Sequence, residues 1–186
     1  MTDRAVQDTT ALDPTPVDGN VRLAAKGDEA AFGRLVSEHH AAMSRVAFVI
    51  CGDVEATHDA VQSAWSIAWR RLATLRDPGQ VGAWLITVAA NEARQAIRTK
   101  RRRPVVDISE TLDRAERGDP ADGIDVLDLQ RALSRLKPDD RRLLALRFVA
   151  GFDSSEIARQ LGGSASGVRS QLARLLDRLR TDMDHG

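Results

Sequence analysis

The chain has 186 residues, and its 27 basic and 27 acidic side chains leave no net formal charge. That length allows one medium domain or two small ones. Aromatic residues make up 4% of the chain and none is tyrosine, which argues against a sheet platform that stacks single-stranded bases.

The single cysteine and the hydropathy pattern exclude a disulfide-linked fold, a cysteine metal site and a membrane-spanning protein. Cys51 lies in an apolar run, VAFVICG, so a disulfide within the chain and a cysteine metal cluster are both excluded. The N-terminus lacks a basic segment followed by an apolar core, and no apolar run approaches the roughly 20 residues that span a bilayer. We therefore expect a cytoplasmic protein without membrane insertion.

The first half of the chain predicts a disordered tail followed by a helical domain. Residues 1–19 are polar and rich in Pro, Asp and Thr, without a helical period. Apolar residues then recur at three- and four-residue steps, the pattern of one face of an amphipathic helix. Capping and breaking residues divide this part into three helices, from Asp28 to Gly52, from Asp53 to about Leu75, and from about Val81 to Pro104. The three tryptophans fall on apolar faces, so we favour core positions for Trp65, Trp69 and Trp84 over a role in stacking on bases, which stays open and is strongest for Trp84.

Residues 104–123 predict a linker, because they are acidic, poor in large apolar residues and interrupted by Gly and Pro. Acidic residues stand three apart without a gap from Asp107 to Asp128. Two interpretations remain open for this row: a solubilising spacer, or a functional element that covers the basic run at 94–103 in the free protein.

Helical periodicity resumes at Ile124, and residues 124–186 predict four further helices, one of them opened by Pro138. We therefore expect an all-α chain with two small helical domains, at 20–103 and 124–186, joined by the acidic linker.

The absence of net charge conceals blocks of opposite sign. Residues 1–69 carry a net charge of −5 and residues 104–129 a net charge of −6, whereas residues 70–103 carry +7 and residues 130–186 carry +4. Electrostatic steering acts through such local fields rather than through the total. The two basic blocks are therefore candidate phosphate-binding surfaces.

Residues 154–180 predict two short helices around a turn at Gly162 or Gly163, one of which supplies a positive φ. Facing apolar residues leave a polar outer face on the second helix: Ser166, Arg169, Ser170, Gln171 and Arg174. Arg and Gln are the donors that read guanine and adenine edges in a major groove, and serines suit phosphates. The pattern favours a DNA-reading helix-turn-helix over a hairpin that serves packing alone.

In this order, the elements resemble the bacterial sigma-70 family of RNA polymerase subunits, in its small extracytoplasmic-function (ECF) group. The first domain is similar to region 2 of that family through GDEAAFGRLVSEHH, DAVQSAWSIAWRRL and GAWLITVAANEARQAIRTKRRR. The second is similar to region 4 through ALSRLKPDDRRLLALRFVAGFDSSEIARQLGGSASGVRSQLARLLDRLR. The resemblance implies a subunit that joins core RNA polymerase, reads two promoter elements and opens the DNA between them. An anti-sigma factor is a candidate further partner.

The resemblance also implies site residues. The minus-35 element would contact Ser166, Arg169, Ser170, Gln171 and Arg174. The minus-10 element would contact the loop TLRDPGQVG and the helix after it, through Arg76, Gln80, Trp84, Asn91, Arg94, Arg98, Lys100 and Arg101. Core polymerase would contact the helix DAVQSAWSIAWRRL and its flanks, through Asp59, Gln62, Ser63, Arg70 and Arg71.

Ser63 departs from the family pattern, which usually has Glu or Asp after this glutamine. A weaker negative face predicts weaker binding to the basic clamp of the polymerase. Phosphorylation of Ser63 or Thr57 would restore charge, since a phosphate adds about −1.5 to −2 at neutral pH. We favour the simpler interpretation, that the change is compensated elsewhere.

Two other classes of function compete with this interpretation. A stand-alone helix-turn-helix regulator would use the second domain and leave the tryptophan-bearing domain without a role. The sequence gives little support to an enzymatic function. Its four histidines do not have the spacing of metal ligands, and it contains no phosphate-binding glycine loop and no nucleophile motif. We therefore expect no catalysis, no cofactor and no small-molecule substrate.

Overall fold

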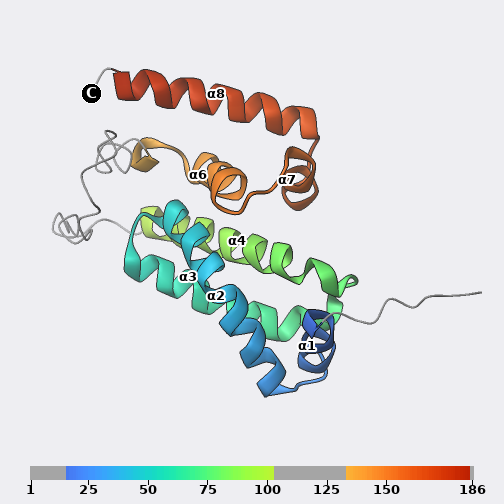
Figure 1. The fold of residues 1–186 in the computed structure, drawn as a ribbon. Coiled ribbons are helices and arrows are strands. Elements are labelled where there is room, and N and C mark those ends of the chain that lie inside the picture. The colour runs from blue at the N-terminus through green and yellow to red at the C-terminus, as the bar shows by residue number, and fades with distance from the viewer. Residues whose placement is uncertain (1–15, 103–132, 185–186) are drawn as a thin grey trace, which may run out of the picture.

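The computed structural model describes residues 16–102 and 133–184, and every regular element within these two ranges is helical, which confirms the all-α expectation (Figure 1). The N-terminal domain, residues 16–102, contains α1 (Pro16–Ala24), α2 (Glu29–Cys51), α3 (Val54–Arg71) and α4 (Val81–Arg102), with short 3₁₀ turns at Leu72–Thr74 and Pro78–Gln80. The C-terminal domain, residues 133–184, contains α6 (Pro138–Leu144), the π-helical turn η3 (Ala145–Val149), α7 (Ser154–Leu161) and α8 (Ala165–Asp184).

The boundary between α2 and α3 lies where the sequence places it. Gly52 ends α2 with φ 70° and donates its backbone N–H to the Phe48 carbonyl, as a left-handed C-cap does. Asp53 then caps α3, since its carboxylate accepts the Ala56 backbone N–H at 2.7 Å. A helix end and a helix start therefore follow one another without a loop.

Helix α1 differs from the expectation for the N-terminus. It begins at Pro16, four residues inside the segment predicted to be a disordered tail. Val21 and Ala24 are buried against the core, and Arg34 of α2 donates a hydrogen bond to Asn20 at 2.7 Å. Tertiary contact with α2 thus holds a helix that the local sequence, with Gly19 in its centre, does not favour. The predicted linker and most of the helix expected from Ile124 lie outside the described residues.

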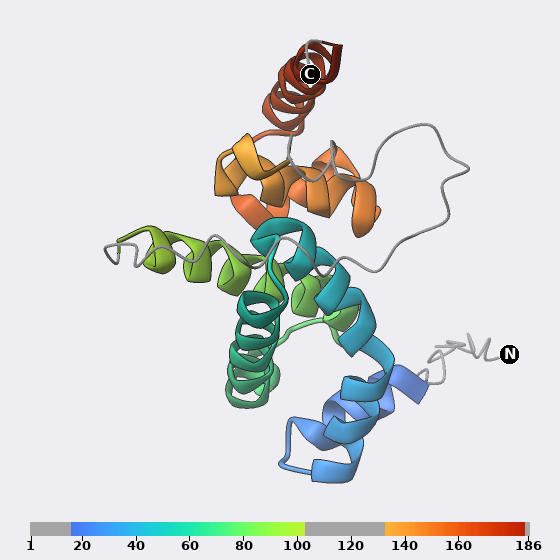
Figure 2. The same cartoon turned by 90° about the vertical axis from the view of Figure 1, so that its left-hand side faces the viewer.

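Two clusters of buried side chains form the interior of the chain. One lies within the N-terminal domain and contains Leu35, Met43 and Leu85. The other is continuous across both domains and joins residues of α2, α3 and α4 to residues of α6, η3, α7 and α8. Figures 1 and 2 show the resulting order: α6 and η3 lie between α8 on the outside and the ends of α2 and α4.

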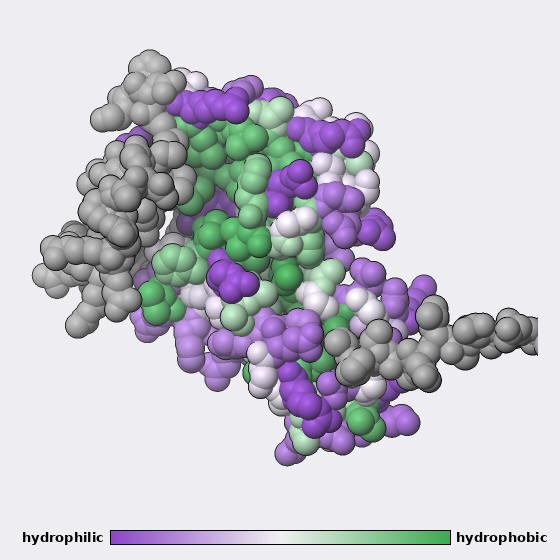
Figure 3. Space-filling view, in the orientation of Figure 1, coloured by the Kyte–Doolittle hydropathy of each residue, from purple (hydrophilic) through white to green (hydrophobic). Residues whose placement is uncertain are grey.

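The helix opened by Pro138 does not continue regularly. From Ala145 it widens into the π-helical turn, in which the Ala150 N–H donates to the Ala145 carbonyl at 3.0 Å. The extra residue in the turn shifts the apolar face, so Leu143, Leu144 and Leu146 are buried while Phe148 is 60% exposed. On the face shown in Figure 3, apolar side chains gather over the C-terminal domain, and polar ones dominate around the lower helices.

Candidate nucleic-acid interface

The C-terminal domain contains the predicted helix-turn-helix. Helix α7 begins with a capping box, in which Asp153 accepts the Glu156 backbone N–H at 2.7 Å and the Glu156 carboxylate accepts the Asp153 N–H at 2.7 Å. Gly162 has φ 74° and Gly163 has φ 144°, so both turn residues adopt backbone conformations that favour glycine. The turn and the start of α7 are fixed by local chemistry.

The polar face of α8 is exposed as expected. Val168, Leu172, Leu175 and Leu179 are buried on its inner side. Five residues are exposed on its outer side: Ser166, Arg169, Ser170, Gln171 and Arg174. These residues are exposed on α8, the helix that lies outermost in Figures 1 and 2, and this side is open to the groove of a DNA duplex.

Asp140 of α6 is a functional candidate that the sequence analysis missed. It is 8% exposed, and its carboxylate accepts hydrogen bonds from Gln171 Nε2 at 3.4 Å and from Arg178 Nη2 at 3.2 Å. A carboxylate in this place connects α6 to two successive turns of α8 and holds the amide of a predicted base-reading residue. No local signal identifies it, because its partners lie 31 and 38 residues away in the sequence.

The basic end of α4 forms a second exposed surface. Asn91 and Arg98 are exposed on α4, and Arg76 and Gln80 are exposed in the loop before it. Trp84 is half-buried and packs against the core of the N-terminal domain. The backbone of Lys100 and Arg101 belongs to α4, and their side chains lie outside the described part of the chain.

Arg94 is the exception on this surface, because it is engaged by the other domain. Its guanidinium donates Nε–H to Asp139 Oδ1 and Nη2–H to Asp139 Oδ2 at 3.4 Å, which forms an ion pair between α4 and α6. Arg142 lies close to both groups. Burial lowers the pKa of Arg142 from its usual value, and the charge of Arg94 lowers it further, whereas Asp139 raises it. The Asp139 carboxylate therefore interacts with two guanidinium groups: it forms an ion pair with Arg94, and its charge stabilises the charged form of Arg142.

The tryptophans occupy different environments, and the core expectation is wrong for one of them. Trp65 is half-buried, and its indole N–H donates to His40 Nδ1 at 3.3 Å. Trp69 is 41% exposed and packs edge-to-face on Phe32, with ring centroids 4.8 Å apart. Trp69 lies close to the end of α3, and periodicity along α3 does not reveal how much of such a side chain the rest of the fold covers.

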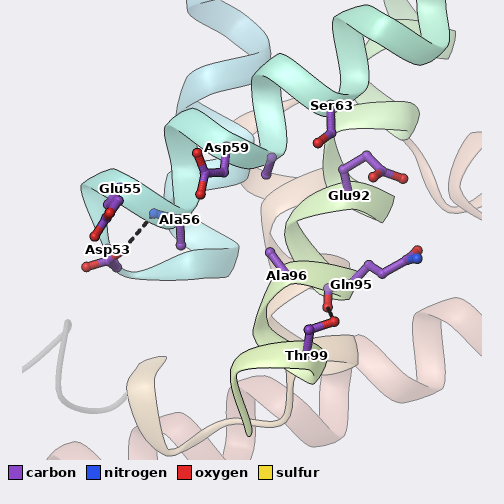
Figure 4. Close-up of a pocket in the computed structure, with 10 residues that line it drawn as sticks. Asp53, Glu55, Ala56, Asp59, Ser63, Glu92, Gln95, Ala96 and Thr99 are labelled. Carbon is purple, nitrogen blue, oxygen red and sulfur yellow. Dashed lines mark hydrogen bonds between the residues drawn. The ribbon is translucent and has the colours of Figure 1, made fainter. Parts of the chain in front are cut away.

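A groove of about 480 Å³ lies between α3 and α4 and is bordered by acidic side chains (Figure 4). From α3 and its N-cap come Asp53, Glu55, Asp59 and Ser63; from α4 come Glu92, Gln95 and Thr99. It brings together two of the predicted polymerase contacts, Asp59 and Ser63. Gln62, Arg70 and Arg71 are exposed on α3 and do not line it.

Thr57 and Ser63 differ in their access to a modifying enzyme. Thr57 is 8% exposed, and its hydroxyl donates to the Asp53 carbonyl at 2.7 Å. Ser63 is exposed beside Glu92 in the groove. Glu92 of α4 therefore provides a carboxylate next to the position where the family pattern has one, which fits the favoured interpretation that the change at Ser63 is compensated elsewhere.

No helix among the described residues is long and apolar enough to cross a membrane. Within the same ranges, no group of three or more His, Cys, Asp or Glu side chains is arranged to hold a metal ion.

A helix-turn-helix with a polar outer helix, attached to a helical domain with a basic helix end, defines a two-domain helical DNA-binding protein. The chain belongs to the sigma-70 family: the family model for Sigma-70 region 2 matches residues 35–103, and the model for Sigma-70 region 4 matches residues 127–179. Similar curated proteins place it in the ECF group.

Three relatives illustrate the similarity. The probable RNA polymerase sigma factor RfaY of Xanthomonas campestris pv. campestris is 33% identical over 168 residues, which cover 86% of this chain and 42% of that protein. The ECF RNA polymerase sigma factor SigM of Mycobacterium tuberculosis is 29% identical over 82% of this chain and 77% of its own length. BldN of Streptomyces coelicolor, also an ECF sigma factor, is 28% identical over 87% of this chain and 65% of its own length. The chain thus spans less than half of the Xanthomonas relative.

Two solved structures share the fold. CnrH, in complex with the cytosolic domain of CnrY, superimposes with a TM-score of 0.66 at 23% identity and covers 91% of this chain and 97% of its own. RpoE of Bartonella quintana, in complex with the anti-sigma factor NepR, gives a TM-score of 0.67 at 22% identity, over 82% of this chain and 96% of its own.

Proposed function

We propose that this chain binds core RNA polymerase and directs promoter-specific initiation of transcription by reading a minus-35 and a minus-10 element. The observation that carries the proposal is the presence of both sigma regions in one chain, each with an exposed polar or basic surface. A subunit of this kind performs no catalysis of its own and acts in the cytoplasm, where the polymerase works. An anti-sigma factor is a proposed further partner.

Helix α8 is the proposed reader of the minus-35 element. Arg169 and Arg174 are suited to guanine, since a guanidinium can donate two hydrogen bonds to O6 and N7. Gln171 is suited to adenine, while Ser166 and Ser170 are suited to phosphate oxygens. Asp140 supports this surface from behind by holding the Gln171 amide.

The loop and helix α4 are the proposed contacts of the minus-10 element. Opening DNA requires a base to leave the stack, which costs a few kcal/mol. Phosphate contacts from cationic residues offset that cost, and α4 carries them in its second half, through Arg94, Arg98, Lys100 and Arg101. Arg76, Gln80, Trp84 and Asn91 are the proposed neighbours of the displaced bases.

The face of α3 is the proposed polymerase contact, through Asp59, Gln62, Ser63, Arg70 and Arg71. Asp59 lies in the acidic groove with Glu92, and a basic clamp would be attracted to this side of the domain.

A promoter-specific transcription experiment tests the proposal. Purified protein is added to core polymerase with a library of bacterial genomic fragments, and transcripts are mapped to their start sites. A sigma factor gives discrete starts that disappear without the protein. A stand-alone regulator binds DNA and gives none, and that result would overturn the proposal.

Single substitutions then distinguish the proposed DNA-binding surface from the proposed polymerase-binding surface. Arg169→Ala is expected to remove initiation while the complex with core polymerase persists. Asp59→Ala is expected to weaken the complex with core polymerase and leave binding of a minus-35 duplex unchanged.

A further inference from the structure

We propose that Asp140 sets the base preference of Gln171. The carboxylate holds the Gln171 side-chain amide in one orientation, so that Oε1 and one N–H remain for the edge of a base. This arrangement selects a base that offers an amino hydrogen in the major groove, adenine first and cytosine second, and disfavours guanine and thymine. The inference deepens the proposed function and rests on it, because it takes α8 to be the reader of the minus-35 element.

The Asp140 carboxylate is held by a donor on each of its oxygens. Gln171 Nε2 donates to Oδ1 at 3.4 Å, and Arg178 Nη2 donates to Oδ2 at 3.2 Å. Asp140 is 8% exposed, so water has little access to the two oxygens. Gln171 and Arg178 stand seven residues apart, nearly two helical turns, on the side of α8 that lies against α6 (Figures 1 and 2). A carboxylate bound at both oxygens keeps its own orientation.

The chemistry of the carboxylate decides which way the Gln171 amide is turned. An ionised carboxylate only accepts hydrogen bonds, whereas the amide has two N–H donors on Nε2 and one acceptor oxygen, Oε1. Turning the amide over would bring Oε1 against Oδ1 of Asp140, two acceptors with no hydrogen between them, and would take a donor from a buried charged group. The amide therefore keeps Nε2 toward Asp140, and Oε1 with the second N–H stays available.

The available part of the amide is open to DNA. Gln171 is exposed and borders a groove of about 580 Å³ between α6 and α8. The other residues that line this groove are three cations and two carboxylates: Lys137, Arg174, Arg178, Asp140 and Asp177. The cations are in excess and attract the phosphates of a duplex. DNA drawn to this side of α8 meets the Gln171 amide beside them.

The base edges match this amide to different degrees. Adenine offers the N7 acceptor and an N6–H donor, which fit one N–H and Oε1 together, and cytosine offers an N4–H donor, which fits Oε1 alone. Guanine offers two acceptors, and thymine offers an acceptor and a methyl group. To meet guanine or thymine with donors alone, the amide must turn and give up Asp140. A glutamine without such a partner turns at little cost, so the carboxylate adds selectivity that glutamine alone lacks.

The first experiment measures the amide in the free full-length chain, by NMR relaxation of the glutamine side-chain NH₂ groups. Gln62, which is exposed on α3, is the reference. We expect the Gln171 amide to be more restricted than that of Gln62, and Asp140→Ala to remove the difference. Asp177→Asn takes a carboxylate charge from the same groove and is the matched control, which should leave the difference intact. Equal mobility of the two amides in the wild type would overturn the proposal.

The second experiment measures base preference. Duplexes are selected from a randomised minus-35 library by the full chain bound to core polymerase, and Gln171→Ala identifies the base pair that this residue reads. At that base pair, Asp140→Asn is expected to reduce the preference for adenine over guanine about three- to tenfold, the equilibrium factor of one hydrogen bond. The reason is that the introduced amide can donate to Oε1 as readily as it accepts from Nε2. Preferences at the other base pairs, and all preferences of Asp177→Asn, should stay as in the wild type.

A merely structural role for Asp140 predicts a different result, an equal loss of affinity for every sequence. That result, or a wild-type preference for guanine or thymine at the base pair that Gln171 reads, would reject the assignment. In a Gln171→Ala background, Asp140→Asn should have no further effect on base preference. If the chain does not join the polymerase, the proposed function is rejected, and the same selection by the chain alone still measures the effect of Asp140.

Discussion

At the scale of single residues, two successive carboxylates of α6 face different elements. Asp139 contacts Arg94 in the other domain, whereas Asp140 contacts Gln171 and Arg178 in its own. Adjacent residues of a helix point about 100° apart. The first turn of α6 can therefore contact α4 through Asp139 and α8 through Asp140. Asp140 is the more buried of the two, so its loss is expected to affect the domain itself.

Asp140→Asn is expected to destabilise the C-terminal domain by about 1 kcal/mol and to weaken minus-35 binding, because α8 loses its ionic contact with α6. Thermal unfolding and titration with a minus-35 duplex measure the two effects. Asp177→Asn is the control: Asp177 pairs with Arg180 at 3.4 Å, but both side chains are more than 70% exposed, so a change of a few tenths of a kcal/mol at most is expected. Equal effects of the two substitutions would contradict a positioning role for Asp140.

Phosphate and base contacts predict different salt dependence. Arg98→Gln is expected to lower the slope of log affinity against log salt by about 0.9 on every promoter, because one phosphate contact is lost. Gln171→Ala is expected to leave that slope unchanged and to cost about 1–3 kcal/mol at one base pair only. Binding of matched and single-substituted promoter DNA by the polymerase complex at several salt concentrations separates these outcomes.

At the scale of elements, the helix-turn-helix depends on a turn whose backbone conformation strongly favours glycine. Gly163 has φ 144°, which L side chains rarely adopt, although nothing lies within 4 Å of a Cβ placed there. The constraint is therefore in the backbone and not in the space around it.

Gly163→Ala is expected to destabilise the C-terminal domain by about 1–3 kcal/mol. Gly33→Ala is the matched control, since Gly33 is exposed within α2 and also has open space around its Cβ position. There the same chemical change should stabilise the protein by about 0.5–1 kcal/mol, because alanine is the better helix former. Chemical denaturation measures both, and changes of the same sign would contradict this account.

Asp153 makes the start of α7 dependent on pH. The backbone N–H of Glu156 lowers the pKa of this carboxyl from its usual value of 3.8; the Ser155 N–H and the charges of Arg159 and Arg147 act in the same direction. Because the folded pKa is the lower one, the cap contributes fully above the unfolded value and its contribution is lost as pH falls through the folded value.

Asp153→Asn caps without titrating, so the wild type is expected to lose stability relative to this variant as pH falls below about 4. Unfolding midpoints of both proteins between pH 7 and pH 2.5 provide the comparison. A constant difference between them over the whole range would contradict the titration of this cap.

At the scale of the whole molecule, the buried cluster that joins the two domains determines how the chain unfolds. Leu143 and Leu146 of one domain share their apolar environment with Val46 and Ile50 of the other. Domains that share a buried interface are expected to unfold together, whereas domains joined only by a linker unfold independently.

Calorimetry of the free chain is therefore expected to show one cooperative transition, with calorimetric and van't Hoff enthalpies in agreement. Asp139→Arg should broaden or split this transition, because the new positive charge then repels the charges of Arg94 and Arg142 at the interface. Two resolved transitions in the wild type would contradict the shared core.

The sequence predicts those parts of the fold and site that depend on near neighbours. The cap at Asp53, the end of α2 at Gly52, the positive φ of the turn at Gly162 and the outward face of α8 all follow from a few adjacent residues, and the structure has each of them. The assigned roles of the exposed residues in binding DNA and polymerase remain predictions.

Other features could not be predicted, because they depend on segments that meet only in space. Helix α1 is held by α2, the widened turn after Ala145 exposes Phe148, and Trp69 is 41% exposed near the end of α3. Arg94 and Asp139 are 45 residues apart, and no periodicity relates them.

The sequence by itself determined the all-helical class, the two domains, the family and the helix-turn-helix, because local capping, turn chemistry and apolar spacing are read along the chain. Only the tertiary structure decided which of the predicted DNA contacts is free. Gln171 is held from behind by Asp140, and Arg94 is paired across the domains by Asp139. The physical reason is that an ion pair or a buried hydrogen bond is set by distance in space, which the order of residues does not specify.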